Sequence, residues 1–200
     1  MAETYASYPL TEEMLGAAYE RAKALPEYEY SHRKLQANFV GCIGELVMGD
    51  FFRRKGVQFT DDRHQTTHDF LVSNCITLDV KTKDRTFKPR RNYDNSVPLY
   101  NHEHQRPDYY YFVSLLRDRK RPVSDIYRFS HAFIVGGLDI ATLQKKGRVW
   151  EADETDPDNG TTFWTSCINV SMADLLSNKE MLSIFRAAAK PDGAANRTVR

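Results

Sequence analysis

A carboxylate and an ammonium group stand close together in residues 75–82. In this segment Leu78 and Val80 alternate with Asp79 and Lys81, and a period of two is typical of a β-strand. The alternation predicts that Asp79 and Lys81 share one face of the strand, which we expect to face solvent. An acid and an ammonium group side by side can hold a cation and orient a water molecule.

Two more acids are expected near this pair. Asp69 begins the preceding expected strand, and a turn at residues 73–74 folds that strand back beside residues 75–82. Glu45 lies in an amphipathic helix expected over residues 31–55. Three converging carboxylates repel one another unless they hold a divalent cation. Oxygen ligands of this kind suit Mg²⁺ or Mn²⁺.

The elements that must position these residues are separated by clear sequence signals. Gly41 and Gly44 lie inside the expected helix that carries Glu45. Because glycine lowers the stability of a helix, we expect another part of the chain to approach the helix closely at these residues. Other helices are expected over 11–25, 97–104 and 139–146, with a last one capped by Ser171 and reaching about residue 188. Other strands are expected over 57–60, 108–116 and 127–135, followed by a hairpin of 148–152 with 161–170.

The motif spacing resembles that of the PD-(D/E)XK nuclease superfamily. The resemblance is carried by Gly41-Cys42-Ile43-Gly44-Glu45 as the helical acidic motif, His68-Asp69 as the PD element, Asp79-Val80-Lys81 as the D-x-K element, and the strand at 107–113. His68 departs from the pattern because it stands where the family has proline. It either senses or shuttles protons near the site or is an ordinary strand-edge histidine.

The resemblance implies a fold and a chemistry. The implied fold is an α/β (α+β), restriction-endonuclease-like αβββαβ core, whose central mixed sheet of four to five strands is flanked by helices. The implied activity is hydrolysis of DNA phosphodiester bonds that depends on Mg²⁺, with Mn²⁺ as a substitute. Glu45, Asp69, Asp79 and the carbonyl of Val80 would be the metal ligands. Lys81 would position the attacking water, so that Glu45, Asp69, Asp79 and Lys81 form the catalytic set.

A basic segment follows the D-x-K element. Residues 81–91 hold six basic residues and one acid, although the whole chain has a formal net charge of only +1. We expect a loop there that binds DNA phosphates through Lys83, Arg85, Lys88, Arg90 and Arg91. A solvated surface loop is the alternative. Phe87, Tyr93 and Tyr100 would either stack on bases or pack the loop onto the domain.

Composition limits the remaining possibilities. The 200 residues are 41% hydrophobic and 28% charged, which is typical of a globular domain. We expect one domain over 1–189, with residues 1–30 as an N-terminal helical extension and 190–200 as a flexible tail. The apolar runs are too short for a membrane span. Three isolated cysteines without a CxxC motif argue against a disulfide framework and predict a cytoplasmic location. His102 and His104 lack the second ligand pair of a zinc site.

These observations favour a small Mg²⁺-dependent endonuclease in phage or mobile-element DNA processing, repair or junction resolution. Cutting two strands generally needs two active sites, so we expect a homodimer. The alternative is a nucleic-acid-binding module on the same fold that does not cleave. A third hypothesis is an interaction protein with an accidental acid cluster, which predicts that Glu45 and Asp79 lie far apart.

Overall fold

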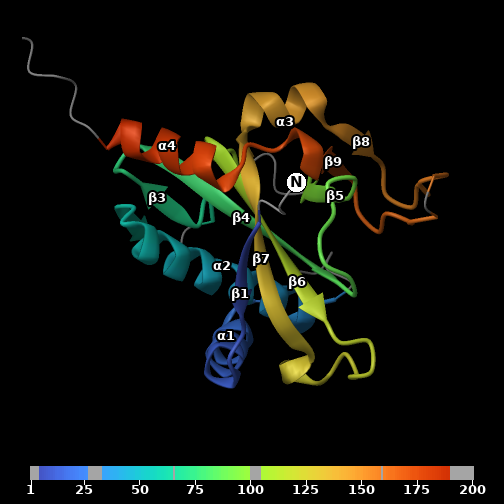
Figure 1. Cartoon of the computed structure of the whole chain (residues 1–200). Coiled ribbons are helices and arrows are strands. Elements are labelled where there is room, and N and C mark those ends of the chain that lie inside the picture. The colour runs from blue at the N-terminus through green and yellow to red at the C-terminus, as the bar shows by residue number, and fades with distance from the viewer. Residues whose placement is uncertain (1–4, 27–32, 65, 100–104, 159, 190–200) are drawn as a thin grey trace, which may run out of the picture.

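A six-stranded mixed sheet is the centre of the α+β fold (Figure 1). The computed structural model describes residues 5–26, 33–64, 66–99, 105–158 and 160–189. The strand order in the large sheet is β1-β7-β6-β4-β3-β2, and only β4 and β6 pair in parallel. These strands are β1 (Ala6–Pro9), β2 (Phe59–Asp61), β3 (Phe70–Val72), β4 (Ile76–Arg85), β6 (Tyr109–Arg117) and β7 (Phe129–Asp139).

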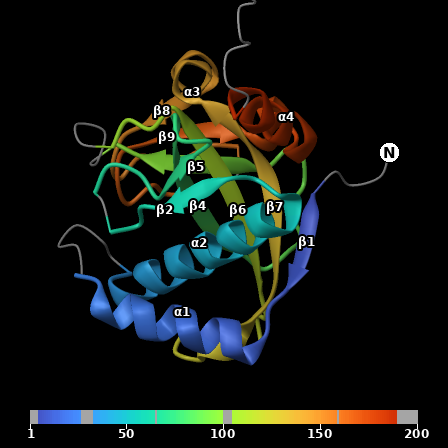
Figure 2. The same ribbon diagram turned by 90° about the vertical axis from the view of Figure 1, so that its left-hand side faces the viewer.

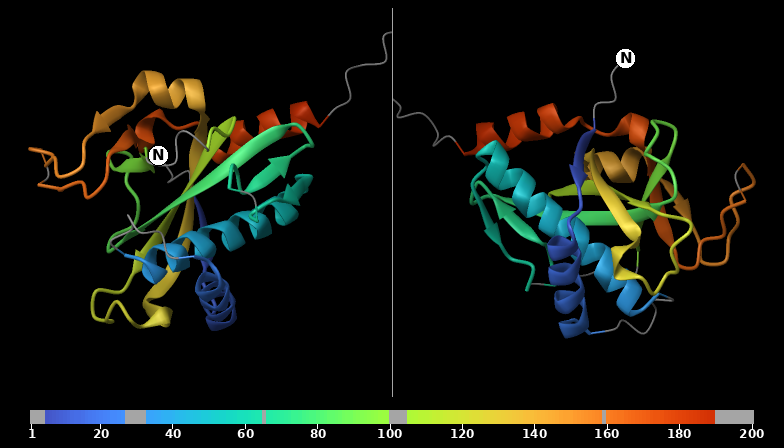
Figure 3. Two further views of the ribbon diagram at one scale, coloured as in Figure 1. Left: turned by 180° about the vertical axis from the view of Figure 1, so that it is seen from behind. Right: turned by 60° about the horizontal axis from the view of Figure 1, so that its bottom comes forward.

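A smaller antiparallel sheet has the order β5-β9-β8. Its strands are β5 (Asp94–Pro98), β8 (Arg148–Trp150) and β9 (Cys167–Ser171). The pairing of β8 with β9 confirms the expected late hairpin, although the strands are shorter than expected. This sheet and α2 lie on opposite sides of β4 (Figure 3).

Four α-helices occur in the described part of the chain: α1 (Glu12–Ala24), α2 (Leu35–Lys55), α3 (Ile140–Lys146) and α4 (Asn178–Ala188). The long helix α2 crosses one face of the large sheet, and α1 packs against α2 (Figure 2). The main core lies between this face and the helices, and it is rich in aromatic rings such as Phe52, Phe70 and Phe185. A second core, with Tyr110 and Phe112, lies between the other face and the small sheet.

The N-terminal segment contributes a strand as well as a helix. Residues 1–30 were expected to form a helical extension, but Ala6–Pro9 pairs antiparallel with β7 and becomes the edge of the large sheet. Tyr8 also packs edge-on against Phe51 of α2, with ring centroids 6.4 Å apart. Thr11 caps α1 as expected, because its side chain accepts a hydrogen bond from the N–H of Met14.

Two helices were predicted at the wrong positions. Residues 94–98 form β5 instead of beginning a helix at 97, because Val97 is buried in the second core and pairs with Ile168 of β9. Residues 100–104 lie outside the described part of the chain. The last helix begins after Ser177 rather than Ser171, since Ser177 and Glu180 form a reciprocal capping box. Ser171 instead caps a single 3₁₀ turn.

The large sheet differs from the expected core in two further ways. It has six strands rather than four or five. The connection from β4 to β6 passes through β5, and its described residues contain no helix. The helix expected over 31–55 begins at Leu35 among the described residues, and residues 31 and 32 lie outside them. The tail at 190–200 lies outside them as well.

Candidate active site

Helix α2 carries Glu45 across β4 at a point of close approach. A Cβ atom on Gly44 would lie 1.8 Å from the Oγ1 of Thr82 in β4. Glycine therefore allows the helix and the strand to touch at this residue, as expected. Gly41 has no such contact, because the atom nearest to a Cβ on Gly41 would be Glu45 Oε1, at 3.8 Å. The Gly44–Thr82 contact thus places Glu45 beside β4.

A tight hairpin brings Asp69 back to β4. The turn residues Ser73 and Asn74 have φ angles of 54° and 59°, as a type I′ turn requires. Asp69 donates its N–H to the carbonyl of Leu78 over 2.9 Å. Its Oδ2 accepts the N–H of Val80 over 2.7 Å. Backbone pairing and a side-chain hydrogen bond therefore fix Asp69 against the D-x-K segment.

Asp79 and Lys81 project from the same face of β4 and form an ion pair. Lys81 Nζ lies 2.6 Å from Asp79 Oδ2. Lys81 also donates to Gln105 Oε1 over 3.3 Å, and its Nζ lies 6.0 Å from the centroid of the Tyr110 ring. Asp79 was expected to face solvent, but it is only 3% exposed. The reason is that this face of β4 is covered by the second core and the small sheet.

The three acids influence one another electrostatically. Burial raises the pKa of Asp69 well above its usual range, and the charges of Asp79 and Glu45 raise it further. Burial also raises the pKa of Glu45, with Asp79 adding to the effect. The structure therefore brings together Glu45, Asp69 and Asp79. The large separation of Glu45 and Asp79 that an accidental cluster predicts is not observed.

For Lys81, burial and the neighbouring charge shift the pKa in opposite directions. Burial acts to lower the pKa of Lys81, but the adjacent Asp79 carboxylate outweighs burial and raises it. The ammonium group is therefore charged at neutral pH. It can donate a hydrogen bond or attract negative charge, but it is not a base.

Two arginines that the sequence analysis did not identify belong to the site. Arg21 of α1 pairs with Glu45 over 3.2 Å, and Arg63 approaches the same carboxylate at 3.9 Å. Both act to lower the pKa of Glu45 against the effect of burial. Neither arginine belongs to a motif or a periodic pattern with Glu45. Only the packing of α1 and of the loop before β3 brings them there.

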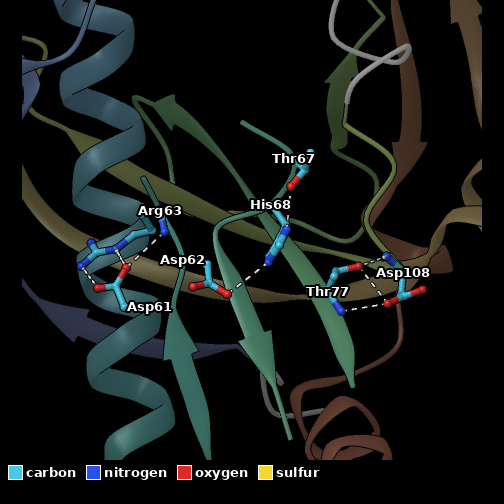
Figure 4. Close-up of polar contacts among 7 residues, drawn as sticks. All are labelled: Asp61, Asp62, Arg63, Thr67, His68, Thr77 and Asp108. Carbon is cyan, nitrogen blue, oxygen red and sulfur yellow. Dashed lines mark hydrogen bonds and ion pairs between the residues drawn. The ribbon is translucent and has the colours of Figure 1, made fainter. Parts of the chain in front are cut away.

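The loop from β2 to β3 is tied together by polar contacts (Figure 4). Arg63 forms a two-pronged ion pair with Asp61. His68 lies 3.3 Å from Asp62 Oδ2 through Nε2 and 2.9 Å from Thr67 Oγ1 through Nδ1. These contacts give His68 a role in holding the loop beside Asp69. The other two histidines considered in the sequence, His102 and His104, lie outside the described residues.

A second clasp joins the starts of β4 and β6 (Figure 4). The Oδ2 atom of Asp108 accepts two hydrogen bonds from Thr77, one from its N–H and one from its hydroxyl, each over 2.8 Å. The N–H of Asp108 donates back to Thr77 Oγ1 over 2.9 Å. This exchange fixes the parallel pair that carries Asp79 and Tyr110 opposite each other.

The basic residues do not all lie in a loop. Lys83 and Arg85 belong to β4, which runs three residues beyond its expected end. Lys83 donates to Ser96 Oγ over 3.3 Å, and Arg85 donates to the carbonyl of Asp94. By contrast, three residues of the segment that follows are exposed: Lys88, Arg90 and Arg91.

The acids supply suitable donors for a hard cation, but the side chains are not arranged around one. Glu45 Oε2 and Asp79 Oδ2 are buried and make no well-directed hydrogen bond to any described residue, although both take part in ion pairs. Carboxylate oxygens that lack hydrogen bonds suit Mg²⁺. Within the described residues, however, no group of three or more His, Cys, Asp or Glu side chains is placed to hold a metal ion.

Fold and site together define an α+β protein with a buried acid cluster and a paired lysine at the junction of a helix and a mixed sheet. No model of a known protein family matches the sequence, and no curated protein matches it either.

Among the described residues, no helix has both the length and the apolar character needed to cross a membrane. Cys42, Cys75 and Cys167 are all free thiols.

Proposed function

We propose that the protein is a metal-dependent deoxyribonuclease that hydrolyses phosphodiester bonds. The observation that carries the proposal is the convergence of Glu45, Asp69 and Asp79, with Lys81 ion-paired to Asp79. Buried like charges are costly. A fold that gathers three acids and one lysine in this way favours a chemical use for them.

Each residue has a role that its surroundings support. Asp69, Asp79 and the carbonyl of Val80 would hold Mg²⁺ or Mn²⁺, and Glu45 would join them. A bound divalent cation supplies charge stabilisation for a phosphate under attack. Binding requires Glu45 to exchange its ion pairs with Arg21 and Arg63 for the cation.

Lys81 would orient the attacking water and stabilise negative charge at phosphorus. Its raised pKa keeps it protonated, so it acts as a hydrogen-bond donor. The exposed Lys88, Arg90 and Arg91 would hold phosphates to either side of the scissile bond. We propose that the substrate is DNA and that the protein is a small endonuclease in phage or mobile-element DNA processing, repair or junction resolution. We also propose that it acts as a homodimer in the cytoplasm.

A cleavage assay tests this function. The protein is incubated with labelled double-stranded, single-stranded and branched DNA in Mg²⁺, Mn²⁺ or EDTA. We expect cutting only with a divalent cation, and a loss of at least about 10²-fold in rate in both Asp79→Asn and Lys81→Met. Lys179→Gln, an exposed change on α4, is the matched control. Equal cutting by the Asp79→Asn variant would refute the proposal.

The second candidate is a nucleic-acid-binding module that does not cleave. The described residues contain no group placed to hold a metal, and the ion pairs of Glu45 with two arginines would neutralise that acid without a cation. This candidate predicts DNA binding that is unchanged by EDTA, with no cutting of any substrate by the unmodified protein. The same assay, combined with a gel-shift measurement, separates the two functions.

A further inference from the structure

A cavity of about 310 Å³ lies farther along β4, away from the acid cluster. Its size falls at the lower end of the range of small-molecule sites. The lining includes two cations, two acids and two aromatic rings: Lys83, Arg85, Asp94, Asp156, Tyr93 and Phe163. No role in the proposed chemistry accounts for this combination.

The cavity and the candidate active site share one face of one strand. Lys83 follows Lys81 by two residues, so both side chains point to the same side of β4. A strand rises about 3.3 Å per residue, which puts their Cα atoms roughly 6.6 Å apart. A nucleic acid strand that reaches Lys81 therefore has the cavity within one or two nucleotides.

One wall of the cavity presents positive charge. The side chain of Lys83 is held by Ser96 Oγ at 3.3 Å. Arg85 donates to the carbonyl of Asp94, and its Nε atom is buried with no hydrogen-bond partner among the described residues. Burial lowers the pKa of Lys83, and the nearby Arg85 adds to the effect. An anion in the cavity would relieve the repulsion between these two cations.

The rest of the lining is unsuited to a simple anion. Asp94 and Asp156 would repel phosphate alone, but they can accept hydrogen bonds from the N–H groups of a ligand. The amide groups of Asn92 and Asn169 can both donate and accept. Phe163 stacks on Trp150, with their ring centroids 4.7 Å apart, and provides a flat apolar wall. The lining thus suits a ligand with an anionic group, a flat ring and polar ring edges.

We propose that this cavity binds one unstacked nucleotide of a DNA strand, with its phosphate on Lys83 and Arg85 and its base against Phe163 and Tyr93. The inference rests on the proposed function in taking DNA as the source of the nucleotide. It narrows the substrate to DNA with a base free to leave the stack, such as single-stranded or distorted DNA, because unstacking costs a few kcal/mol in an intact duplex.

The first test uses mononucleotides, without metal and without cleavage. Calorimetry in EDTA compares deoxyadenosine monophosphate, deoxyadenosine and inorganic phosphate. We expect the monophosphate to bind more tightly than either fragment, and its affinity to fall about tenfold in Lys83→Gln and in Asn92→Ala. Asn92 is exposed, so its variant should fold even if the Lys83 variant does not. Lys179→Gln, which loses the same charge on α4, should bind the monophosphate like the unmodified protein.

Two results would overturn the inference. Equal binding of inorganic phosphate and the monophosphate would mean a site for anions only. Unchanged binding of the monophosphate in both cavity variants would mean that the cavity is not its site. Neither result depends on catalysis, because Asp79→Asn should bind the monophosphate as well as the unmodified protein does. Failure of the nuclease proposal would appear separately, in the cleavage assay.

A second measurement distinguishes a nucleotide within a strand from a free one. Oligonucleotides carrying the fluorescent base 2-aminopurine are bound to the Asp79→Asn variant. We expect the fluorescence of one position to increase on binding as that base leaves the stack, and the increase to disappear when Asn92→Ala is added. Binding of free monophosphate without any unstacked position in the strand would refute the assignment to DNA.

Discussion

Lys81 and Asp79 illustrate how a buried ion pair can be both costly and useful. Asp79 is only 3% exposed, and Lys81 is the partner that compensates its charge. Removal of one partner leaves an uncompensated charge in the interior, which costs about 3–5 kcal/mol. Asp79→Asn and Lys81→Met preserve the shape of the side chains better than alanine does, but each still leaves the charge of its partner uncompensated. A thermal melt of each variant therefore accompanies its cleavage assay, so that a loss of cutting by a folded variant reports on chemistry.

Asp69 gives a prediction about pH and stability. Its pKa is raised in the folded protein by burial and by Asp79 and Glu45, whereas the unfolded chain has a value of about 3.9. The folded state therefore binds the proton more tightly. Without a divalent cation, the contribution of Asp69 to the free energy of unfolding should be greatest below the unfolded pKa, fall as pH rises through the interval between the two values, and then level off.

Asp69→Asn should remove the contribution of Asp69 to this dependence, although Glu45 still contributes in the same direction. The amide keeps an oxygen to accept the N–H of Val80. In EDTA at pH 8 we expect the variant to be more stable than the unmodified protein by about 1 kcal/mol. Thermal unfolding followed by circular dichroism from pH 4 to pH 9 measures the difference. The matched control is Asp158→Asn, the same change of residue type in the acidic loop before β9. A less stable Asp69→Asn variant at pH 8 would contradict the prediction.

At the scale of elements, the contact of α2 with β4 depends on one glycine. A methyl group at Gly44 would collide with Thr82, so we expect Gly44→Ala to lower the free energy of unfolding by about 1–3 kcal/mol. Gly41→Ala in the same helix meets nothing closer than 3.8 Å. It should be neutral or stabilising by up to ~1 kcal/mol, because alanine favours the helix. Urea denaturation of the two variants makes the comparison.

A double variant checks the cause. If the collision with Thr82 is responsible, Thr82→Ala should recover part of the stability that Gly44→Ala loses, and the two changes should not be additive. Additive losses would show that Gly44 matters for another reason.

Helix α4 depends on its capping box. Ser177 accepts the N–H of Glu180, while the Glu180 carboxylate accepts the N–H and hydroxyl of Ser177. These bonds lower the pKa of Glu180. Ser177→Ala should cost about 1 kcal/mol, whereas Ser183→Ala, at an exposed position inside the helix, should not destabilise. Thermal melts of both variants test this, and equal melting temperatures would argue against the cap.

At the scale of the whole molecule, β1 closes one edge of the large sheet. It pairs with β7 over four residues, and Tyr8 packs on Phe51 of α2. Deletion of residues 1–10 should expose the edge of β7 and lower the melting temperature. It should also promote association, because an open strand edge pairs with other chains. Light scattering and thermal unfolding measure both effects, with deletion of residues 1–4 as the control. Unchanged melting and scattering after the longer deletion would contradict a structural role for β1.

The arrangement of the two sheets also separates two regions on β4. The first half of the strand meets α2 and β3 and holds the acid cluster, while its far end meets β5 and the cavity. A single extended strand thus connects a site suited to chemistry with a site suited to binding.

Local sequence signals determined much of the fold. Alternation in residues 76–82 and the turn at 73–74 are properties of neighbouring residues, and they placed Asp69 near Asp79 correctly. The helix caps at Thr11 and Asp139 and the strand at 109–117 follow from equally local preferences. The motif at 177–180 carries a capping-box signal in the sequence, so the start of α4 was also open to prediction.

Only the tertiary structure decided the surroundings of these residues. The burial of Asp79, the ion pairs of Glu45 with Arg21 and Arg63, the strand at 94–98 and the cavity beside Lys83 all join segments that are distant in the chain. Residue preferences and periodicity describe neighbours along the chain. Which charges are buried together depends on how helices and sheets pack, because burial and electrostatic attraction act across space.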